Sequence, residues 1–328
     1  MGFMLCTFAA FYYLAELAAA ESGRRPEKIR FSLLKFAGAS VAGAGLAGIT
    51  LIPGIAAVSR TAAAEKAGTG LSGVYGDIWK QLGELFEDSQ SFVKSGDQGD
   101  VNIYCGCAVL LFAGIYFLNK EIRTAEKIVT GILIVLYFAG IHITALNLLF
   151  HGLHKPVGIP NRFVFILIFL LLKMSCDAWG NVENESTGRI FAGLIAAEGF
   201  FIVVGIKSGN IWGLLLTAGV LAVFFLVMWT ERCICGKLSG HAFCCVEIRK
   251  LGYLVLAVLI LAETGIHGIV SITDNGTANR DIYVESEQEV CGLLESAGVD
   301  QVDYRAAIVN PLVRNEEMLH LHMTGIFP

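Results

Sequence analysis

The sequence predicts an all-α polytopic membrane protein, a bundle of about eight transmembrane helices followed by a truncated extracytoplasmic α/β tail. Apolar residues fill 55% of the 328 positions and charged residues only 16%, against about a quarter in a typical soluble domain. Several apolar runs approach the roughly 20 residues that a helix needs to cross a hydrocarbon core of about 30 Å. These runs lack period-two alternation, so their backbone hydrogen bonds have to be satisfied within helices.

Six long apolar runs, and two that are slightly shorter or rich in glycine, give the predicted spans. They are residues 2–20, 31–58, 102–118, 128–150, 162–179, 189–206, 210–229 and 251–271. Residues 1–271 therefore form the predicted bundle. Residues 272–328 are predicted to begin an extracytoplasmic domain.

Basic residues concentrate in alternate loops, which predicts the orientation of the bundle. The odd-numbered loops carry most of them: Arg24, Arg25, Lys28, Arg30, Lys120, Arg123, Lys127, Lys173, Arg189, Arg232, Lys237, Arg249 and Lys250. Short loops rich in Lys and Arg face the cytoplasm. We therefore expect a multi-pass membrane protein with both termini of this chain outside the cytoplasm.

The polar segment 59–101 contains one apolar helical stripe, formed by Val74, Ile78, Leu82, Leu85 and Phe86. We expect an amphipathic outer loop that packs on the ends of the bundle, with a role in gating substrate as the alternative.

The tail carries two short patterns. Residues 285–297 predict a helix that ends at Gly298, and residues 302–309 predict a strand. Some fifty residues bury little core on their own, so we expect the C-terminal domain to be cut short.

The clearest candidate site is the loop between the fourth and fifth predicted spans. Its polar side chains are Asn147, His151, His154, Lys155, Asn161 and Arg162. Basic groups at a membrane surface suit a phosphate or pyrophosphate head group whose lipid tail stays in the bilayer. The alternative is that Lys155 and Arg162 only anchor helix ends.

Polar residues inside predicted spans give a second candidate. Glu263 and His267 lie four residues apart on one face of the last span, where they could pair with each other or bind a ligand.

Metal and nucleotide sites receive little support. Cys233, Cys235, His241, Cys244 and Cys245 fit no standard zinc spacing, so we predict no protein metal site, although a divalent cation as cofactor remains open. The sequence has no Walker loop, no dinucleotide fingerprint and no nucleic-acid-binding patch. No cofactor is identified.

Several motifs resemble the YfhO-type bacterial membrane proteins over nearly the whole chain. The strongest are LNLLFHG at residues 146–152 and PNRFVF at residues 160–165, which are similar to the family's Leu-Asn-x-x-Trp-His-Gly and Pro-x-Arg-aromatic-Ser-Phe patterns. Further similar stretches are MGFMLC at the start, LIP at residues 51–53, NIYCG at residues 102–106, DYR at residues 303–305 and RNEEML at residues 314–319. Phe150, Val164 and Val101 depart from the patterns, replacing Trp, Ser and Pro.

The family resembles C-type glycosyltransferases, which use polyprenyl-phosphate sugars outside the cytoplasmic membrane. The resemblance implies transfer of a sugar to a cell-surface glycopolymer such as lipoteichoic acid. Arg162 and His151, supported by Lys155 and His154, would then contact the lipid phosphate. The family's helices that precede the Met-Gly-Phe-Met run, with the outer loop expected to hold a catalytic acid, have no counterpart in this chain. Whether the chain is itself an enzyme therefore stays open, and no residue is assigned as the base.

Two other functions remain. The chain could be a transporter or flippase-like protein for a polyprenyl-linked glycan, with Glu198, Glu263 and His267 along the path. It could also be a non-catalytic remnant that binds lipid or a partner.

Overall fold

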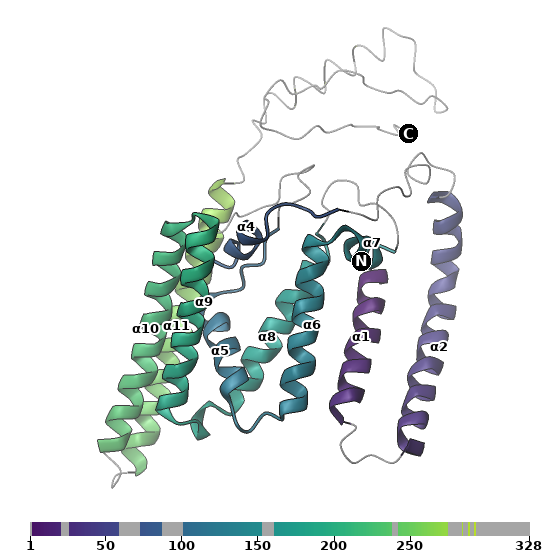
Figure 1. The fold of residues 1–328 in the computed structure, drawn as a ribbon. Helices are drawn as coiled ribbons and strands as arrows, with labels where there is room; N and C mark the ends of the chain where they lie inside the picture. The colour runs from purple at the N-terminus through teal and green to yellow at the C-terminus, as the bar shows by residue number, and fades with distance from the viewer. Residues whose placement is uncertain are drawn as a thin grey trace. The chain divides into compact units, whose positions relative to one another are not determined.

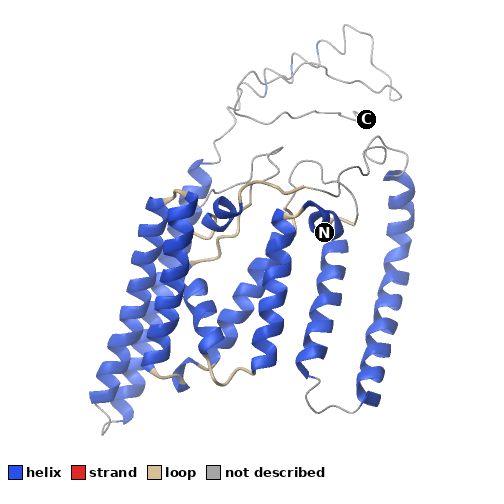
Figure 2. Cartoon of the chain, viewed as in Figure 1, coloured by secondary structure: helices blue, strands red, loops and turns tan. Residues whose placement is uncertain are grey.

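The protein is a bundle of helices (Figures 1 and 2). The computed structural model describes residues 2–20, 26–58, 73–86, 101–152, 161–237 and 242–274, with the single residues 284, 288 and 292. Within these ranges the helices are α1 (Gly2–Ala20), α2 (Pro26–Val58), α4 (Ile78–Gly83), α5 (Cys107–Leu118), α6 (Thr124–His142), α7 (Thr144–Phe150), α8 (Val164–Gly180), the 3-10 helix η1 (Val182–Asn184), α9 (Thr187–Ser208), α10 (Ile211–Lys237) and α11 (Ala242–Asp274).

Six described helices are long and apolar enough to cross a membrane: α1, α2, α6, α9, α10 and α11. The predicted helical membrane protein is therefore confirmed, whereas the count of eight spans is not. Predicted span 102–118 forms a helix only from Cys107 to Leu118, and α8 has 17 residues. At 1.5 Å per residue, the 12 residues of α5 reach only about 18 Å.

The short helix α5 lies in the middle of the bundle. It packs against α8, α9 and α10, and eight of its residues are buried. Residues 101–106, which lead into it, form no helix or strand. Irregular backbone is tolerated at membrane depth where protein covers it, and both Val101 and Ile103 in this segment are buried.

Close contact between α5 and α9 depends on a glycine. A Cβ added to Gly193 would lie 2.8 Å from the Ile115 side chain and 3.3 Å from the Ile115 backbone. Opposite it, a Cβ on Gly114 would lie 3.1 Å from the Gly193 carbonyl oxygen. Small residues let membrane helices approach closely, and here they bring α9 against the central helix.

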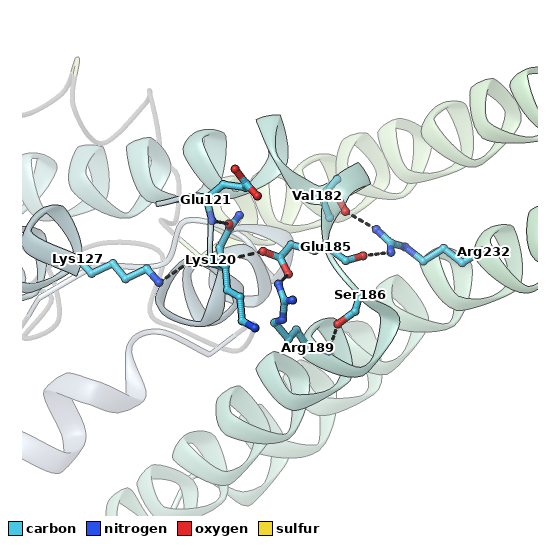
Figure 3. A network of polar contacts seen from close by, with 9 residues as sticks. Lys120, Glu121, Lys127, Val182, Glu185, Ser186, Arg189 and Arg232 are labelled. Atoms are coloured by element: carbon cyan, nitrogen blue, oxygen red, sulfur yellow. Dashed lines mark hydrogen bonds and ion pairs between the residues drawn. The ribbon is translucent and has the colours of Figure 1, made fainter. Parts of the chain in front are cut away.

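The basic loops meet at one end of the bundle, which we call the basic end. It comprises residues 119–123, 181–186, 231–237 and 245–250. The Lys120 backbone N–H donates a hydrogen bond to the Glu185 carboxylate at 3.0 Å, and Arg232 donates to the Glu185 backbone carbonyl (Figure 3). Arg249 forms an ion pair with Glu183 at 3.0 Å. Three separate loops are thus tied together.

Segment 73–86 covers the opposite end and corrects the predicted amphipathic stripe. Leu85 and Phe86 are buried, but Val74 is 64% exposed and Ile78 is 38% exposed. The helix α4 has only six residues, too few to carry the whole stripe. Val74 instead pairs with Ile143 in an isolated antiparallel bridge.

The remaining parts of the predicted outer loop, residues 59–72 and 87–100, lie outside the described residues. The predicted tail helix and strand also lie outside them, apart from the single residues 288 and 292. The α/β character of the tail therefore stays a prediction.

Candidate functional site

The candidate site lies at the end opposite the basic end, which we call the Asn147 end. It comprises residues 73–86, 143–152 and 161–163. Helix α6 ends at His142, Ile143 is extended, and α7 follows for seven residues. The Tyr75 backbone N–H donates to the His142 carbonyl at 2.7 Å, and the His142 Nδ1 atom lies 3.0 Å from the Tyr75 carbonyl oxygen. These bonds fix the break between α6 and α7, which sets where α7 points.

Asn147 joins the two ends of the loop that the sequence singled out. Its side chain is fully buried, and its Nδ2 atom donates to the Gly140 carbonyl at 3.1 Å and to Asn161 Oδ1 at 2.9 Å. Asn161 is itself only 4% exposed. One buried amide pair thus connects the end of α7 to the residues that precede α8.

His151 caps the C-terminus of α7. Its Nδ1 atom lies 2.8 Å from the Asn147 carbonyl oxygen, and its ring meets the edge of the Phe163 ring at 5.7 Å between centroids. The next residue, Gly152, has φ +71°, a left-handed conformation that glycine adopts without the steric cost of a Cβ. The His-Gly pair therefore terminates the helix and turns the chain.

Arg162 directly precedes the Phe163 whose ring His151 contacts. Phe163 is fully buried whereas Arg162 is exposed. The structure therefore brings together Asn147, His151, Asn161 and Phe163, and Arg162 is the residue between the last two in the chain. His154 and Lys155, the other two predicted members, lie outside the described residues.

Three buried aromatic rings pack together next to this cluster, and we call them the aromatic floor. Tyr137 and Phe150 are stacked at 4.7 Å with an interplanar angle of 15°, and Phe150 meets Phe163 at 4.8 Å. All three are fully buried. A packed aromatic floor holds the polar residues above it in fixed rotamers, which a site for a specific ligand requires.

The second candidate pair, Glu263 and His267, has a different arrangement. Glu263 is 8% exposed, and its Oε1 atom accepts hydrogen bonds from the Tyr104 hydroxyl and from the Cys107 backbone N–H, both at 2.5 Å. The His267 ring lies against Tyr104, with 4.4 Å between centroids. Because Cys107 is the first residue of α5, Glu263 places a carboxylate at the positive end of that helix. Both residues thus anchor the start of α5 to α11.

Glu185 at the basic end was not identified as important from the sequence. Its side chain is 1% exposed and forms an ion pair with Arg189. Its Oε1 atom accepts from the Lys120 N–H at 3.0 Å, so the buried charge has partners on two sides (Figure 3). The available signal was Arg189 four residues later, which is a common helical ion-pair spacing. This network links the loops at the basic end to one another, so its role is structural.

Metal-binding side chains do not converge in the part of the chain that the structure describes, where no group of three or more His, Cys, Asp or Glu could hold an ion. Cys235 and Cys245 face each other across α10 and α11, each thiol lying against the other residue's carbonyl oxygen at 3.7 and 3.6 Å. The positions of the His241 and Cys244 side chains lie outside the description.

Comparison with known proteins agrees with the helical architecture. The family model described as "Bacterial membrane protein YfhO" matches residues 1–320. No curated protein and no solved structure matches the chain. Because the family match covers nearly the whole chain, the protein belongs to the YfhO family of bacterial membrane proteins.

Proposed function

We propose that this chain is part of a membrane glycosyltransferase that takes a sugar from a polyprenyl-phosphate donor and delivers it to a cell-surface polymer such as lipoteichoic acid. The observation that carries the proposal is the buried Asn147–Asn161 hydrogen bond, 2.9 Å long. It connects the end of α7, which is followed by His151, to the segment that carries Arg162 eleven positions later in the chain. A phosphate needs such convergent donors, while its polyprenyl tail needs adjacent lipid.

Each residue at the Asn147 end has a proposed role. Arg162, being exposed and always charged, binds the donor phosphate. His151 donates to a phosphate oxygen or supports Arg162, and Lys155 and His154 add positive charge. When the sugar leaves, negative charge grows on the phosphate, and preorganised cations stabilise that charge. No residue of this chain is assigned as the base that activates the acceptor hydroxyl, and a divalent cation bound with the donor stays an open component.

Replacing Arg162 tests this role. We expect Arg162→Ala to lower sugar incorporation into the surface polymer by about 100-fold, the loss typical of removing one strong transition-state donor. Lys207→Ala is the matched control, because Lys207 lies in the last turn of α9 at the same end of the bundle and is exposed. Incorporation and membrane insertion are measured for both variants in cells that carry the gene in its native context. Normal incorporation by Arg162→Ala would remove the site assignment.

A transporter of a polyprenyl-linked glycan is the second candidate, and the interrupted helices favour it. Transporters place discontinuous helices near the membrane midplane, and α5 resembles such a helix, because it has only 12 residues and follows the non-helical residues 101–106 in the middle of the bundle. Glu198, Glu263 and His267 would then line the path. Under this function Glu263→Gln abolishes export of the lipid-linked glycan. Under the transferase function the same variant keeps normal sugar incorporation per folded molecule, so assays of both activities separate the two functions.

A further inference from the structure

A cavity lies at the basic end, between α10, α11 and η1. Its volume is about 170 Å³, and six of the side chains that line it are Trp179, Glu183, Glu231, Arg232, Arg249 and Tyr253. At roughly 30 Å³ per water, the cavity has room for about five waters or one small polar group. Sites for drug-sized ligands start at about 300 Å³, so a nucleotide sugar does not fit. The cavity is independent of the proposed function, which uses the opposite end of the bundle.

Two positive and two negative side chains line this cavity. Arg249 pairs with Glu183 at 3.0 Å and with Glu231 at 3.5 Å. The side chains of Arg249 and Glu183 are 42% and 49% exposed, and ion pairs at such exposure contribute little to stability and exchange partners easily. Glu231 is the more enclosed carboxylate, at 15% exposed.

Arg232 is held in place with donors to spare. Its two Nη atoms donate to the backbone carbonyls of Val182 and Glu185 (Figure 3). A guanidinium has five N–H donors. Within the part of the chain that the structure describes, these carbonyls are its hydrogen-bond acceptors, so three donors remain for a ligand. The backbone bonds preorganise the group, which lowers the entropy lost on binding.

Aromatic and apolar side chains complete the walls. The Trp179 and Tyr253 rings lie 5.1 Å apart, and the Tyr253 hydroxyl donates to Glu183. Met228 and Leu256, both 5% exposed, form the apolar part. Trp and Tyr favour the boundary between lipid and water, which is where the ends of membrane helices lie.

We propose that this cavity binds the head group of a zwitterionic phospholipid of the phosphoethanolamine type. The phosphate lies between Arg232 and Arg249, and the ammonium group lies against Glu231 and Glu183. The formal charges of these four side chains cancel. A purely anionic head group would bring negative charge against both carboxylates, and a simple amine would bring positive charge against both arginines. A ligand that carries both charges a few atoms apart satisfies all four.

Binding of short-chain lipids to the purified full chain in detergent tests this assignment by native mass spectrometry. We expect dioctanoyl-phosphatidylethanolamine to bind at least tenfold more tightly than dioctanoyl-phosphatidylglycerol, and more tightly than free O-phosphoethanolamine. Arg249→Gln should lose about tenfold in affinity for both lipids. Glu231→Gln should lose affinity only for phosphatidylethanolamine, because an ammonium partner has gone, so it should remove the preference between the lipids. A merely structural defect would weaken the binding of both lipids alike.

Lys250→Gln and Glu247→Gln are the matched controls. These residues form an exposed ion pair at 2.8 Å on the same helix and do not line the cavity. Both controls should keep the wild-type affinities. Equal binding of the two lipids by the wild type would overturn the proposal, as would a retained preference in Glu231→Gln. Equally tight binding of free O-phosphoethanolamine would also overturn the assignment of a lipid, because it would show that the cavity recognises a soluble ligand.

Discussion

At the scale of single residues, Asn147 is the residue that joins the two ends of the candidate loop, through two hydrogen bonds from its side chain. Its Nδ2 group donates one hydrogen bond to the Gly140 carbonyl in α6 and one across the loop to Asn161 Oδ1. Its Oδ1 atom is buried without a hydrogen-bond partner among the described residues. A buried polar atom of that kind is costly, which is a feature of sites shaped for a ligand.

Removing this amide should destabilise the protein. We expect Asn147→Ala to lower the free energy of unfolding in detergent by about 1 to 3 kcal/mol, because Asn161 Oδ1 and the Gly140 carbonyl lose their buried donor. Asn181→Ala is the control, since it removes one part-buried hydrogen bond, to the Asp177 carbonyl at 3.0 Å. Chemical denaturation followed by tryptophan fluorescence compares the two. Equal losses would mean that Asn147 does not join the loop ends as described.

At the scale of helices, close packing around α5 organises the bundle. We expect Gly193→Ala to lower the free energy of unfolding by about 1 to 3 kcal/mol, because the new methyl group overlaps Ile115. Gly199→Ala in the same helix has nothing within 4 Å of its new Cβ, so it should be neutral or stabilise by up to about 1 kcal/mol. The same denaturation measurement checks both. A neutral Gly193→Ala would refute the close approach of α5 and α9.

Helix content was predictable from the sequence, because long apolar runs leave the backbone no alternative in lipid. The length of α5 was not predictable from the sequence. The apolar pattern of residues 102–118 fits a full membrane helix, and it fits equally a shorter helix preceded by an irregular segment that neighbouring helices cover. The pairing of Asn147 with Asn161 was not predicted, because the sequence shows only that both belong to one short loop. Glu263 was predicted as polar and intramembrane, but its bond to the start of α5 depends on a helix 156 positions away in the chain.

At the scale of the whole molecule, the bundle has two chemically different ends. The basic end holds the ion-pair network around Glu185 and the lipid cavity, and the Asn147 end holds the proposed donor site. A polyprenyl-phosphate sugar used outside the cell requires the Asn147 end to face outward, and the positive-inside rule requires the same orientation.

Labelling with a membrane-impermeant thiol reagent tests this central claim most directly. In a background with the nine native cysteines replaced by serine, Arg162→Cys and Lys120→Cys each place one exposed thiol at one end of the bundle. We predict that Arg162→Cys is labelled in intact cells, and that Lys120→Cys is labelled only after permeabilisation. The opposite pattern would place the Asn147 end in the cytoplasm and contradict the proposed use of an external lipid-linked donor.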